Sequence, residues 1–337
     1  MSDLPFAHGG PPLCGRLRAT PEDFEVDEML GFNAEGAGEH AWLHVEKRAA
    51  NTEWVAQQLA RAAGVAPMAV GYSGLKDRHA VTRQTFSVHL PGRPDPDWHA
   101  LEIEGVRILE AGRHSRKLKR GVHRSNRFRI RLCELVGDRE AAGQRIGQVA
   151  RLGVPNYFGA QRFGHNGENL RIAHALFAGA RMGRSQRGFA LSAARSHLFN
   201  LVLARRVEQR TWNQALDGEV WMLAGTHSIF GPQPFDDDLR ERLLRHDIDP
   251  TGPLWGCGEL RSAAEVASIE AAIAHSETAL ADGLAANDLR QERRSLCLHA
   301  SDFSHEWMAD GSLVLAFSLP SGTFATSVVR EICATSS

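Results

Sequence analysis

Residues 126–132, NRFRIRL, restrict the fold of this chain more than any other segment, because they read as one strand with two different faces. Three apolar residues alternate with three arginines, and successive side chains of a strand point to opposite faces of a sheet. Asn126 shares the parity of Phe128, so the two side chains are expected to project together. The opposite face carries Arg127, Arg129 and Arg131, for which structural ion pairs are one interpretation.

The rest of the chain is strand-rich at both ends and helix-rich in the middle. Strand-like segments with alternating or apolar patterns are 24–28, 42–45, 86–90, 296–299 and 313–319. Helical patterns dominate 153–299, and further helices are expected at 51–64, 138–152 and 323–332. One helix in the middle is expected to begin with a capping box, Ser262-Ala-Ala-Glu265. This order indicates a helix-rich domain inserted into a strand-rich one.

Cationic residues gather in two segments, although the whole chain is nearly neutral. Lys and Arg total 39 against 40 Asp and Glu, a formal net charge of −1. Residues 113–131 nevertheless hold nine Lys or Arg without an acid, and residues 169–207 hold seven Arg without an acid. Nucleic-acid binding depends on where cations gather, so both segments are candidates for phosphate contacts. A solvated charged face is the alternative for 113–131.

Several functional classes find no support in the residues. The five cysteines (14, 133, 257, 297 and 333) are scattered and never in CxxC spacing, which argues against a disulfide framework and a zinc site. Neither GxGxxG nor GxxxxGK occurs, so no nucleotide cofactor is indicated. No signal-peptide pattern and no run of about 18 apolar residues is present. We therefore expect a cytoplasmic protein without metal, cofactor or membrane association.

Residues 71–87, GYSGLKDRHAVTRQTFS, hold the candidate catalytic group. Gly71 and Gly74 permit a tight turn or the close approach of another surface. They lead to Asp77, which is flanked by two cations and a histidine. Flanking cations favour the ionised form of an acid, so Asp77 is expected to be an anion that acts as a nucleophile or a base. The alternative is an exposed turn whose charges pair weakly.

The segment GLKDRHAVTRQ resembles the signature of the TruD family of tRNA pseudouridine synthases, Gly-x-Lys-Asp-Lys/Arg-x-Ala-x-Thr-x-Gln. Five more segments resemble that family in order: TPEDFEVDE (20–28), RKLKRGVHRSNRFRIRL (116–132), VPNYFGAQRFG (154–164), LSAARSHLFN (191–200) and LPSGTFATSVVRE (319–331). The resemblance covers nearly the whole chain. It implies an α/β (α+β) fold with a discontinuous pseudouridine synthase catalytic domain (1–152 and 300–337), built on a mixed, mainly antiparallel sheet. A helix-rich TRUD domain (153–299) is inserted into it.

The resemblance also implies an isomerase that converts uridine to pseudouridine in tRNA, at uridine 13 and with glutamate tRNA as an expected substrate. Asp77 stands at the position of the catalytic residue, and Phe128 at that of the aromatic that stacks on the extruded uracil. Asn126 would supply amide hydrogen bonds beside it. Phe24 and Phe324 fall in two other motif blocks and are expected to line the pocket, although core packing is the alternative for each phenylalanine.

Two residues depart from the family pattern. Arg18 stands where the family more often has lysine, and it is expected to pair with Asp77. Ser125 stands where the family usually has glycine, so its Cβ would affect the turn into the strand. Tyr157 and Phe158 are expected to form a domain-joining turn rather than to stack on RNA.

The expected partner is tRNA, bound by a monomeric chain. Phosphate contacts are expected from four cations that precede the strand at 126–132, namely Arg116, Lys117, Lys119 and Arg120. A catalytically silent RNA-binding or RNA-chaperone module on the same fold is the alternative function, and an intact Asp77 argues against it. A hydrolase with Asp77 as nucleophile is a second alternative, for which no second, water-activating carboxylate motif is found.

Overall fold

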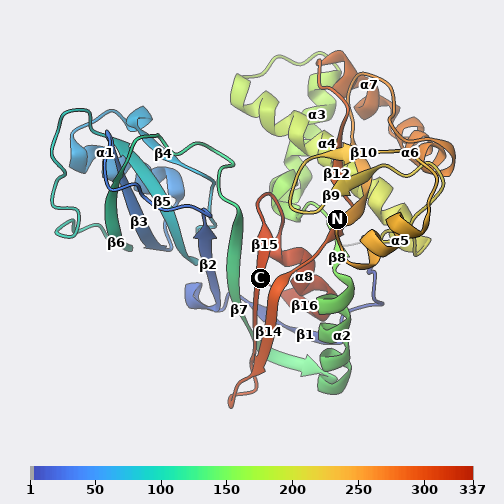
Figure 1. Ribbon diagram of the computed structural model, residues 1–337, viewed down its shortest axis with the longest axis horizontal. Coiled ribbons are helices and arrows are strands. Elements are labelled where there is room, and N and C mark those ends of the chain that lie inside the picture. The colour runs from blue at the N-terminus through green and yellow to red at the C-terminus, as the bar shows by residue number, and fades with distance from the viewer. Residues whose placement is uncertain (1–3, 337) are drawn as a thin grey trace. The chain divides into compact units, whose positions relative to one another are not determined.

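The segment 126–132 lies within β7 (Ser125–Gly137), the longest strand of the computed structural model, which describes residues 4–336 (Figure 1). One edge of β7 pairs with β15 (Leu313–Pro320). The other edge pairs first with β2 (Phe24–Met29) and then with β1 (Leu13–Leu17). Asn126, Phe128 and Ile130 are buried and Arg127 and Arg129 are exposed, so the predicted alternation is confirmed.

β7 belongs to a ten-stranded sheet with the order β14-β15-β7-β2-β5-β3-β6, which β1, β4 and β16 join at the sides. The remaining strands are β3 (His40–Arg48), β4 (Val70–Tyr72), β5 (Val81–His89), β6 (Val106–His114), β14 (Ser301–Trp307) and β16 (Cys333–Ser336). β2 with β5 and β1 with β16 are parallel, and the other pairings are antiparallel. The expected α+β class with a mixed, mainly antiparallel sheet is confirmed.

Residues paired across five strands form one row of side chains on a single face of this sheet. Lys47 pairs with Thr82, and Thr82 pairs with Val26. Val26 pairs with Phe128, which in turn pairs with Phe317. Residues directly opposite each other in a sheet lie on the same face, and all five are buried. The row therefore joins a buried lysine to a set of buried aromatic rings.

Helix α1 (Thr52–Ala63) covers the β3 and β5 end of the same face. Its bounds agree with the expected helix at 51–64, although the side chain of Asn51 makes no capping hydrogen bond. Gly64, which follows the helix, has a left-handed φ of 60°. Its apolar side packs into a core with strand residues: Val55 and Leu59 with Leu43, Val45, Phe86 and Val88. Burying each such side chain stabilises the fold by about 1.5–3 kcal/mol.

The opposite face of the sheet carries a row of ion pairs. Arg83 contacts Asp27 and Glu46, each at 2.9 Å, and Glu25 at 3.3 Å. Arg129 contacts Glu25 at 3.2 Å. These pairs are partly exposed, so each contributes little stability, but together they neutralise Arg83 and Arg129. Arg127 is exposed and has no ion pair within residues 4–336. Arg131 pairs with Asp310, and the ion-pair interpretation is confirmed for Arg129 and Arg131.

The chain groups into two compact units, each described by itself. Unit 2 comprises Pro12–Ala142, Ala300–Gly322 and the described residues of Cys333–Ser337. Unit 1 comprises the described residues of Met1–Pro11, together with Gly143–His299 and Thr323–Ile332. The chain passes from one unit to the other within α2 (Arg139–Leu152), which follows Asp138 as expected. The domain limits at 152/153 and 299/300 stay a prediction.

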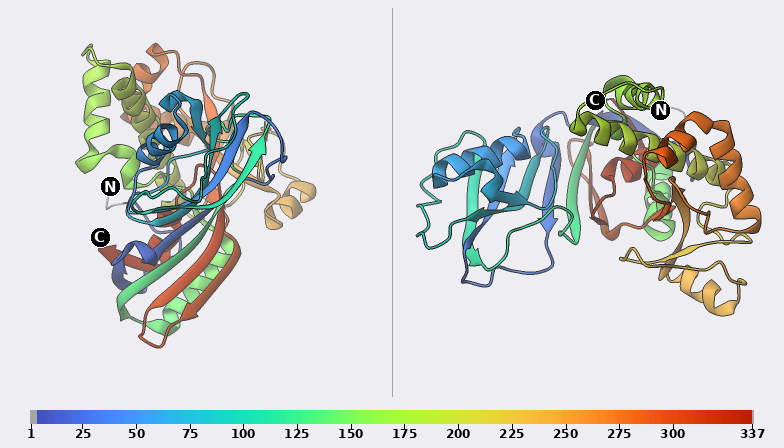
Figure 2. Two further views of the ribbon diagram at one scale, coloured as in Figure 1. Left: turned by 90° about the vertical axis from the view of Figure 1, so that its left-hand side faces the viewer. Right: turned by 90° about the horizontal axis from the view of Figure 1, so that it is seen from above.

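Unit 1 contains most of the helices and a small sheet that the sequence patterns do not indicate (Figure 2). The helices are α3 (Glu168–Phe177), α4 (Arg184–Glu208), α5 (Asp237–Leu244), α6 (Ala264–Ser276), α7 (Thr278–Ala286) and α8 (Ala325–Ile332). The sheet has the order β10-β9-β11-β12, with β10 (Ile229–Phe230), β9 (Trp221–Leu223), β11 (Ile248–Leu254) and β12 (Glu292–Ser295). Prolines 250 and 253 lie inside β11, and proline usually argues against a strand.

The shorter elements complete the path of the chain. β8 (Val154–Pro155) pairs with β13 (Cys297–Leu298) in unit 1. Single 3-10 turns are η1 (Pro21–Asp23), η2 (Pro67–Ala69), η3 (Ala160–Phe163) and η4 (His165–Gly167).

The capping box predicted at 262–265 is wrong. Helix α6 begins after Ala263 without a side-chain cap. The hydroxyl of Ser262 instead donates to Oε2 of Glu270, at 2.6 Å. Glu270 also accepts two hydrogen bonds from Arg293, at 2.8 and 2.9 Å, and both side chains are buried. A buried carboxylate needs several donors, and this one takes the serine that the pattern assigns to the helix start.

Arg293→Met should destabilise unit 1, because Glu270 would keep a buried charge without its partner. We expect the free energy of unfolding, measured by urea denaturation, to fall by about 3–5 kcal/mol. The control is Arg245→Ala, which removes the exposed pair with Glu241 one helical turn away and should cost less than about 0.5 kcal/mol. An equally small loss for Arg293→Met would show that the pair is not stabilising.

Candidate active site

Asp77 lies in the irregular segment 73–80 of unit 2, between β4 and β5. The loop 115–124, which joins β6 to β7, packs against the residues that precede Asp77. A Cβ at Gly71 would lie 2.3 Å from the carbonyl oxygen of Leu118, and one at Gly74 would lie 3.3 Å from Cε1 of His123. Gly71 is therefore required by a close backbone approach, as expected from the sequence.

Arg18 and the backbone of His79 hold the carboxylate of Asp77. Nη2 of Arg18 lies 2.7 Å from Oδ2, and the amide of His79 donates to Oδ1 at 2.9 Å. The guanidinium of Arg18 also lies over the ring of Phe24, 4.2 Å from its centroid. An arginine can do both, because its planar group stacks on a ring while its edge donates hydrogen bonds. The expected contact between Arg18 and Asp77 is present.

A buried lysine holds the backbone at the same residue. Nζ of Lys47 donates to the carbonyl oxygens of Asp77, at 2.9 Å, and Ala50, at 2.7 Å. Burial lowers the pKa of Lys47 to about 8; the charge of Asp77 opposes this shift and that of Lys76 adds to it. Lys47 lies fully buried at the end of the row that contains Phe128. Through this hydrogen bond to the carbonyl oxygen, Lys47 fixes the backbone position of Asp77.

Side chains from three more elements fix the residues before Asp77. Thr52 accepts a hydrogen bond from the amide of Lys76 at 3.0 Å and donates to Gln84 at 2.9 Å. Gln84 donates to the carbonyl oxygen of Gly74 at 3.2 Å. Nζ of Lys76 pairs with Oε2 of Glu28 at 2.6 Å, and both side chains are nearly inaccessible. The segment is thus held by hydrogen bonds to α1, β2, β3 and β5 rather than by regular structure of its own.

The predicted aromatic residues of unit 2 form one cluster. The rings of Phe24 and Phe128 meet edge to face, with centroids 6.1 Å apart. Phe128 also packs on Phe317 at 5.6 Å. Phe128 is 7% exposed and Phe24 is 4% exposed. Because Arg18 contacts both Asp77 and Phe24, the cluster is continuous with the carboxylate.

Asn126 places an unused acceptor at the start of β7. Its Nδ2 lies 3.3 Å from Nε2 of His123, and its Oδ1 is buried without a hydrogen-bond partner among residues 4–336. Burial lowers the pKa of His123, and the charge of Lys76 adds to that effect. Ser125 pairs in regular register with Met29 and Pro320, so the sheet accommodates this departure from the family glycine.

The four cations predicted to contact RNA phosphates are all exposed and lie in the loop 115–124. Lys117 donates to the carbonyl oxygen of Met68 at 2.5 Å. Arg120 lies over the ring of Tyr72, 4.4 Å from its centroid, and its guanidinium is 3.7 Å from Glu53. These cations border the segment that leads to Asp77. The structure thus combines Asp77, Arg18, Phe24, Asn126, Phe128 and this loop within unit 2.

The remaining predicted aromatic, Phe324, belongs to unit 1. Its ring lies 6.2 Å from that of Phe158, and both contribute to a hydrophobic cluster. Tyr157 and Phe158 are buried there, at 2% and 6% exposure. Both lie inside unit 1, so the expected domain-joining turn at these residues stays a prediction.

One group of possible metal ligands occurs within residues 4–336, and hydrogen bonds explain its geometry. It comprises Asp249, Cys297 and His299. Nε2 of His299 lies 3.0 Å from Oδ1 of Asp249, whose Oδ2 accepts from Ser295 at 3.0 Å. Sγ of Cys297 donates to the carbonyl oxygen of Trp212 at 3.4 Å, and burial raises the pKa of this thiol well above its usual value. The protonated thiol is a poor metal ligand.

The sequence patterns miss Lys47, Thr52, Gln84, Glu28 and His123. Lys47 sits in a charged run, Glu46-Lys47-Arg48, that looks like the exposed end of a strand. Only strict parity with Leu43 and Val45 indicates its burial. Glu28 has the parity of Phe24 and Val26, which is the same kind of signal.

The family model described as tRNA pseudouridine synthase D (TruD) matches residues 4–183 and 171–332. The chain is 50% identical over 331 residues to tRNA pseudouridine synthase D of Chromohalobacter salexigens, covering 97% of this chain and 95% of that protein. It is 49% identical over 350 residues to tRNA pseudouridine synthase D of Xanthomonas campestris pv. campestris, covering 98% and 95%. A crystal structure from Methanosarcina mazei, described as a candidate tRNA pseudouridine synthase D, matches with a TM-score of 0.74 at 20% identity and covers 97% of this chain and 95% of that one. At that identity the likeness concerns the fold.

These matches put the chain in the class of pseudouridine synthases, which are isomerases. Within that class the chain belongs to the tRNA pseudouridine synthase D (TruD) family, and the resemblance found in its motifs is confirmed. Within residues 4–336, no helix has the length and apolar character needed to cross a membrane.

Lys47 should make the stability of unit 2 depend on pH. Its pKa is about 8 in the folded state against an ordinary 10.5, so between these values the unfolded state binds more protons and the free energy of unfolding rises with pH. We expect the stability difference between wild type and Lys47→Met to shift by about 2–3 kcal/mol in favour of wild type from pH 7 to pH 10. Urea denaturation at a series of pH values measures it.

The two hydrogen bonds lost in Lys47→Met reduce stability at every pH and cancel from this comparison. The exposed Lys119→Met is the matched control for the loss of a lysine. The same pH profile for both variants would contradict the assigned burial of the ammonium group.

Proposed function

We propose that this chain converts uridine 13 of tRNA to pseudouridine, with glutamate tRNA among its substrates and Asp77 as the catalytic residue. The observation that carries the proposal is the carboxylate of Asp77, 2.7 Å from Arg18 and next to the cluster of Phe24 and Phe128. Membership of the tRNA pseudouridine synthase D family supports the reaction and the RNA class.

The reaction needs a carboxylate in a fixed position and little else. The N1–C1′ bond of uridine breaks, the uracil turns, and a bond from C5 to C1′ forms. C5 loses a proton and N1 gains one, so the product is an isomer and no group or electron is gained. Asp77 fits three roles: attack on the sugar, attack on the base, or removal of a sugar proton. We propose that neither a metal nor a diffusible cofactor takes part.

We propose that Arg18 and Lys47 together hold Asp77 in position. Arg18 contacts the carboxylate itself, and Lys47 contacts the carbonyl oxygen of the same residue. A group fixed at both its backbone and its side chain loses little entropy when it reacts, which favours catalysis.

Phe128 and Asn126 are the proposed contacts for the extruded uracil. A uridine must leave the base stack before an enzyme can reach its glycosidic bond, and an aromatic ring is the usual support for the freed base. Phe128 is only 7% exposed, so we propose that the uracil stacks on the small part of its ring that is accessible. The unpartnered Oδ1 of Asn126 is suited to accept the N3–H of uracil. We propose that Phe24 supports Arg18 and Phe128.

We propose that the enzyme works in the cytoplasm, where tRNA is, and as a monomer. The alternative function is an RNA-binding or RNA-chaperone module without catalysis. It predicts that changes at Asp77 leave every activity of the protein intact.

Asp77→Asn should abolish pseudouridine formation while tRNA binding changes less than about tenfold, or about 1.4 kcal/mol. The substitution keeps the shape of the side chain and removes its charge. Turnover is followed as tritium release from tRNA that carries [5-³H]uridine, because C5 loses its hydrogen. A tRNA with cytidine at position 13 should release no tritium, because the uridine proposed to react is absent.

The matched control is Asp27→Asn, the same chemical change in an ion pair on the opposite face of the sheet. It should leave turnover within a few-fold of wild type. Turnover by a verified Asp77→Asn preparation would refute the catalytic assignment.

The exposed loop 115–124 should supply much of the affinity for tRNA by neutralising phosphates. Each phosphate-contacting cation that is lost should reduce the slope of log K against log salt by roughly 0.7–0.9. We therefore expect the Lys117/Lys119/Arg120 triple Ala variant to bind tRNA more weakly and with a flatter slope, as measured by anisotropy of labelled tRNA across a salt series.

An Arg107/Arg129/Arg131 triple Ala variant is the control, because it changes the net charge equally on the face whose cations are already paired with acids. Equal slopes for the two variants would show that the loop is only a solvated charged surface.

A further inference from the structure

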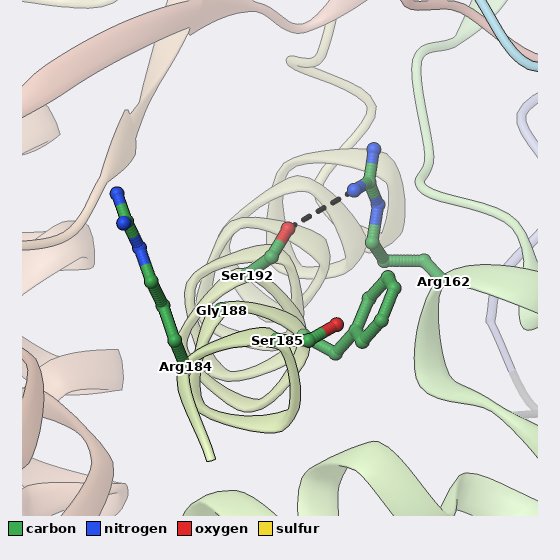
Figure 3. A pocket seen from close by; sticks show the side chains of 6 residues that line it. Arg162, Arg184, Ser185, Gly188 and Ser192 are labelled. Carbon is green, nitrogen blue, oxygen red and sulfur yellow. Dashed lines mark hydrogen bonds between the residues drawn. The ribbon is translucent and has the colours of Figure 1, made fainter. Parts of the chain in front are cut away.

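The first turns of α4 border an open hollow in unit 1 that the proposed chemistry does not use. Its volume is about 660 Å³, within the range of ligand sites. The lining residues come from one stretch of α4 and from η3: Arg184, Ser185, Gly188, Phe189, Ser192 and Arg162. Figure 3 shows Arg162 donating to Ser192, with Ser185 directed to the same side of the helix and Arg184 extending along the other.

Two of these residues have no structural explanation. Phe189 is 60% exposed, although a phenylalanine of this helix would gain about 1.5–3 kcal/mol from burial. Gly188 lies in the interior of α4, where glycine costs about 1 kcal/mol relative to alanine. No atom of the described residues lies within 4 Å of the position that a Cβ would occupy at Gly188, so packing within residues 4–336 does not require the glycine. An exposed ring beside a bare helix backbone is suited to a flat ligand that stacks closely.

The charge around the hollow selects an anionic ligand. Residues 169–207, which include the whole α4 part of the lining, contain seven Arg and no acid. The only acidic residue in α4 is Glu208, at its far end. Nη1 of Arg162 donates to Oγ of Ser192 at 3.0 Å. This hydrogen bond holds the guanidinium of Arg162 against α4. Arg162 also lies over the ring of Phe158, 5.3 Å from its centroid, so its position is fixed.

We propose that this hollow binds a nucleotide of the tRNA, outside the uridine that reacts. Arg162 and Arg184 contact phosphates on either side of the first turns of α4, and one base stacks on Phe189 against the bare backbone of Gly188. Ser185 and Ser192 offer hydroxyls to the ribose or phosphate oxygens. Stacking on an aromatic ring tolerates any base, so the site adds affinity without a sequence requirement.

This inference rests on the proposed function, since it takes tRNA to be the substrate. An acidic protein segment also carries negative charge, but it has no flat base to use the exposed ring and the glycine. The combination of arginines with an unburied aromatic therefore favours RNA.

The test compares tRNA binding by variants of exposed residues, which should fold normally. Phe189→Leu removes the ring and keeps an apolar side chain, and it should weaken binding roughly 5- to 150-fold, the range for the loss of one stacked base. Phe189→Trp keeps a ring and should bind at least as tightly as wild type. Arg184→Ala should reduce the slope of log K against log salt by roughly 0.7–0.9.

The matched control is Arg205→Ala, on the same helix and outside the hollow, where the arginine pairs with Glu208. It should leave the slope at the wild-type value. Phe189→Leu binding like wild type, or equal slopes for Arg184→Ala and Arg205→Ala, would overturn the proposal.

A tryptophan at position 189 also reports on the occupant. Its fluorescence, relative to the seven native tryptophans, should be quenched by tRNA and not by polyglutamate. Equal quenching by polyglutamate would overturn the proposal in favour of an acidic protein partner. Binding is measured separately from tritium release, so the two ideas fail separately. If the wild type forms pseudouridine and Phe189→Leu binds tRNA as tightly as wild type, only the proposal for the hollow is refuted. If Phe189→Leu weakens tRNA binding but the wild type forms no pseudouridine, only the catalytic function is refuted.

Discussion

The parallel pairing of β2 with β5 is the constraint on which the candidate active site depends. It is the one link in the sheet order between β14-β15-β7-β2 and β5-β3-β6. β5 follows directly after the segment that carries Asp77, and β2 is the neighbour of Asn126 and Phe128 in β7. Because Val26 pairs with Thr82, Glu28 reaches Nζ of Lys76. A register shift of one residue would turn Glu28 to the other face of the sheet and remove this contact.

The charged groups on the two faces of the sheet differ in their exposure to solvent. On one face arginines and acids are partly exposed and neutralise one another, so their exact geometry matters little. On the other face Lys47, Gln84 and Glu28 are buried, and a buried polar group has to be hydrogen-bonded. Their partners are backbone groups and side chains of the irregular segment 73–80. The same bonds that satisfy the buried groups therefore position Asp77, so the stability of the sheet and the geometry of the candidate site depend on one network.

Local patterns predict the parts of this structure that arise from local rules. The alternation at 126–132 predicts β7 and the face of Asn126, and the glycines at 71 and 74 predict the close approach beside Asp77. Lys47 and Glu28 are missed because a charged residue in a strand normally points to solvent, and their burial depends on partners distant in sequence. The sheet of unit 1 is missed because β11 contains two prolines. Ser262 is misassigned because its partner, Glu270, becomes a buried anion only when Arg293 is adjacent. Long-range contacts, not local preferences, decide these positions.

The nearly neutral net charge of the chain is compatible with binding a polyanion because its acids are not evenly distributed. The sheet face that carries the ion pairs holds three of these acids, Glu25, Asp27 and Glu46. They neutralise Arg83, Arg107 and Arg129 there. The loop 115–124 and residues 169–207 contain no acid of their own. Salt screens exposed charges beyond about 8–10 Å, so a phosphate near either segment interacts with the local cations rather than with the total. Arg120 shows the limit of this argument, because Glu53 lies 3.7 Å from it and competes with a phosphate for the same guanidinium. The contribution of each cation to RNA affinity therefore depends on the nearest carboxylate more than on the charge of the chain.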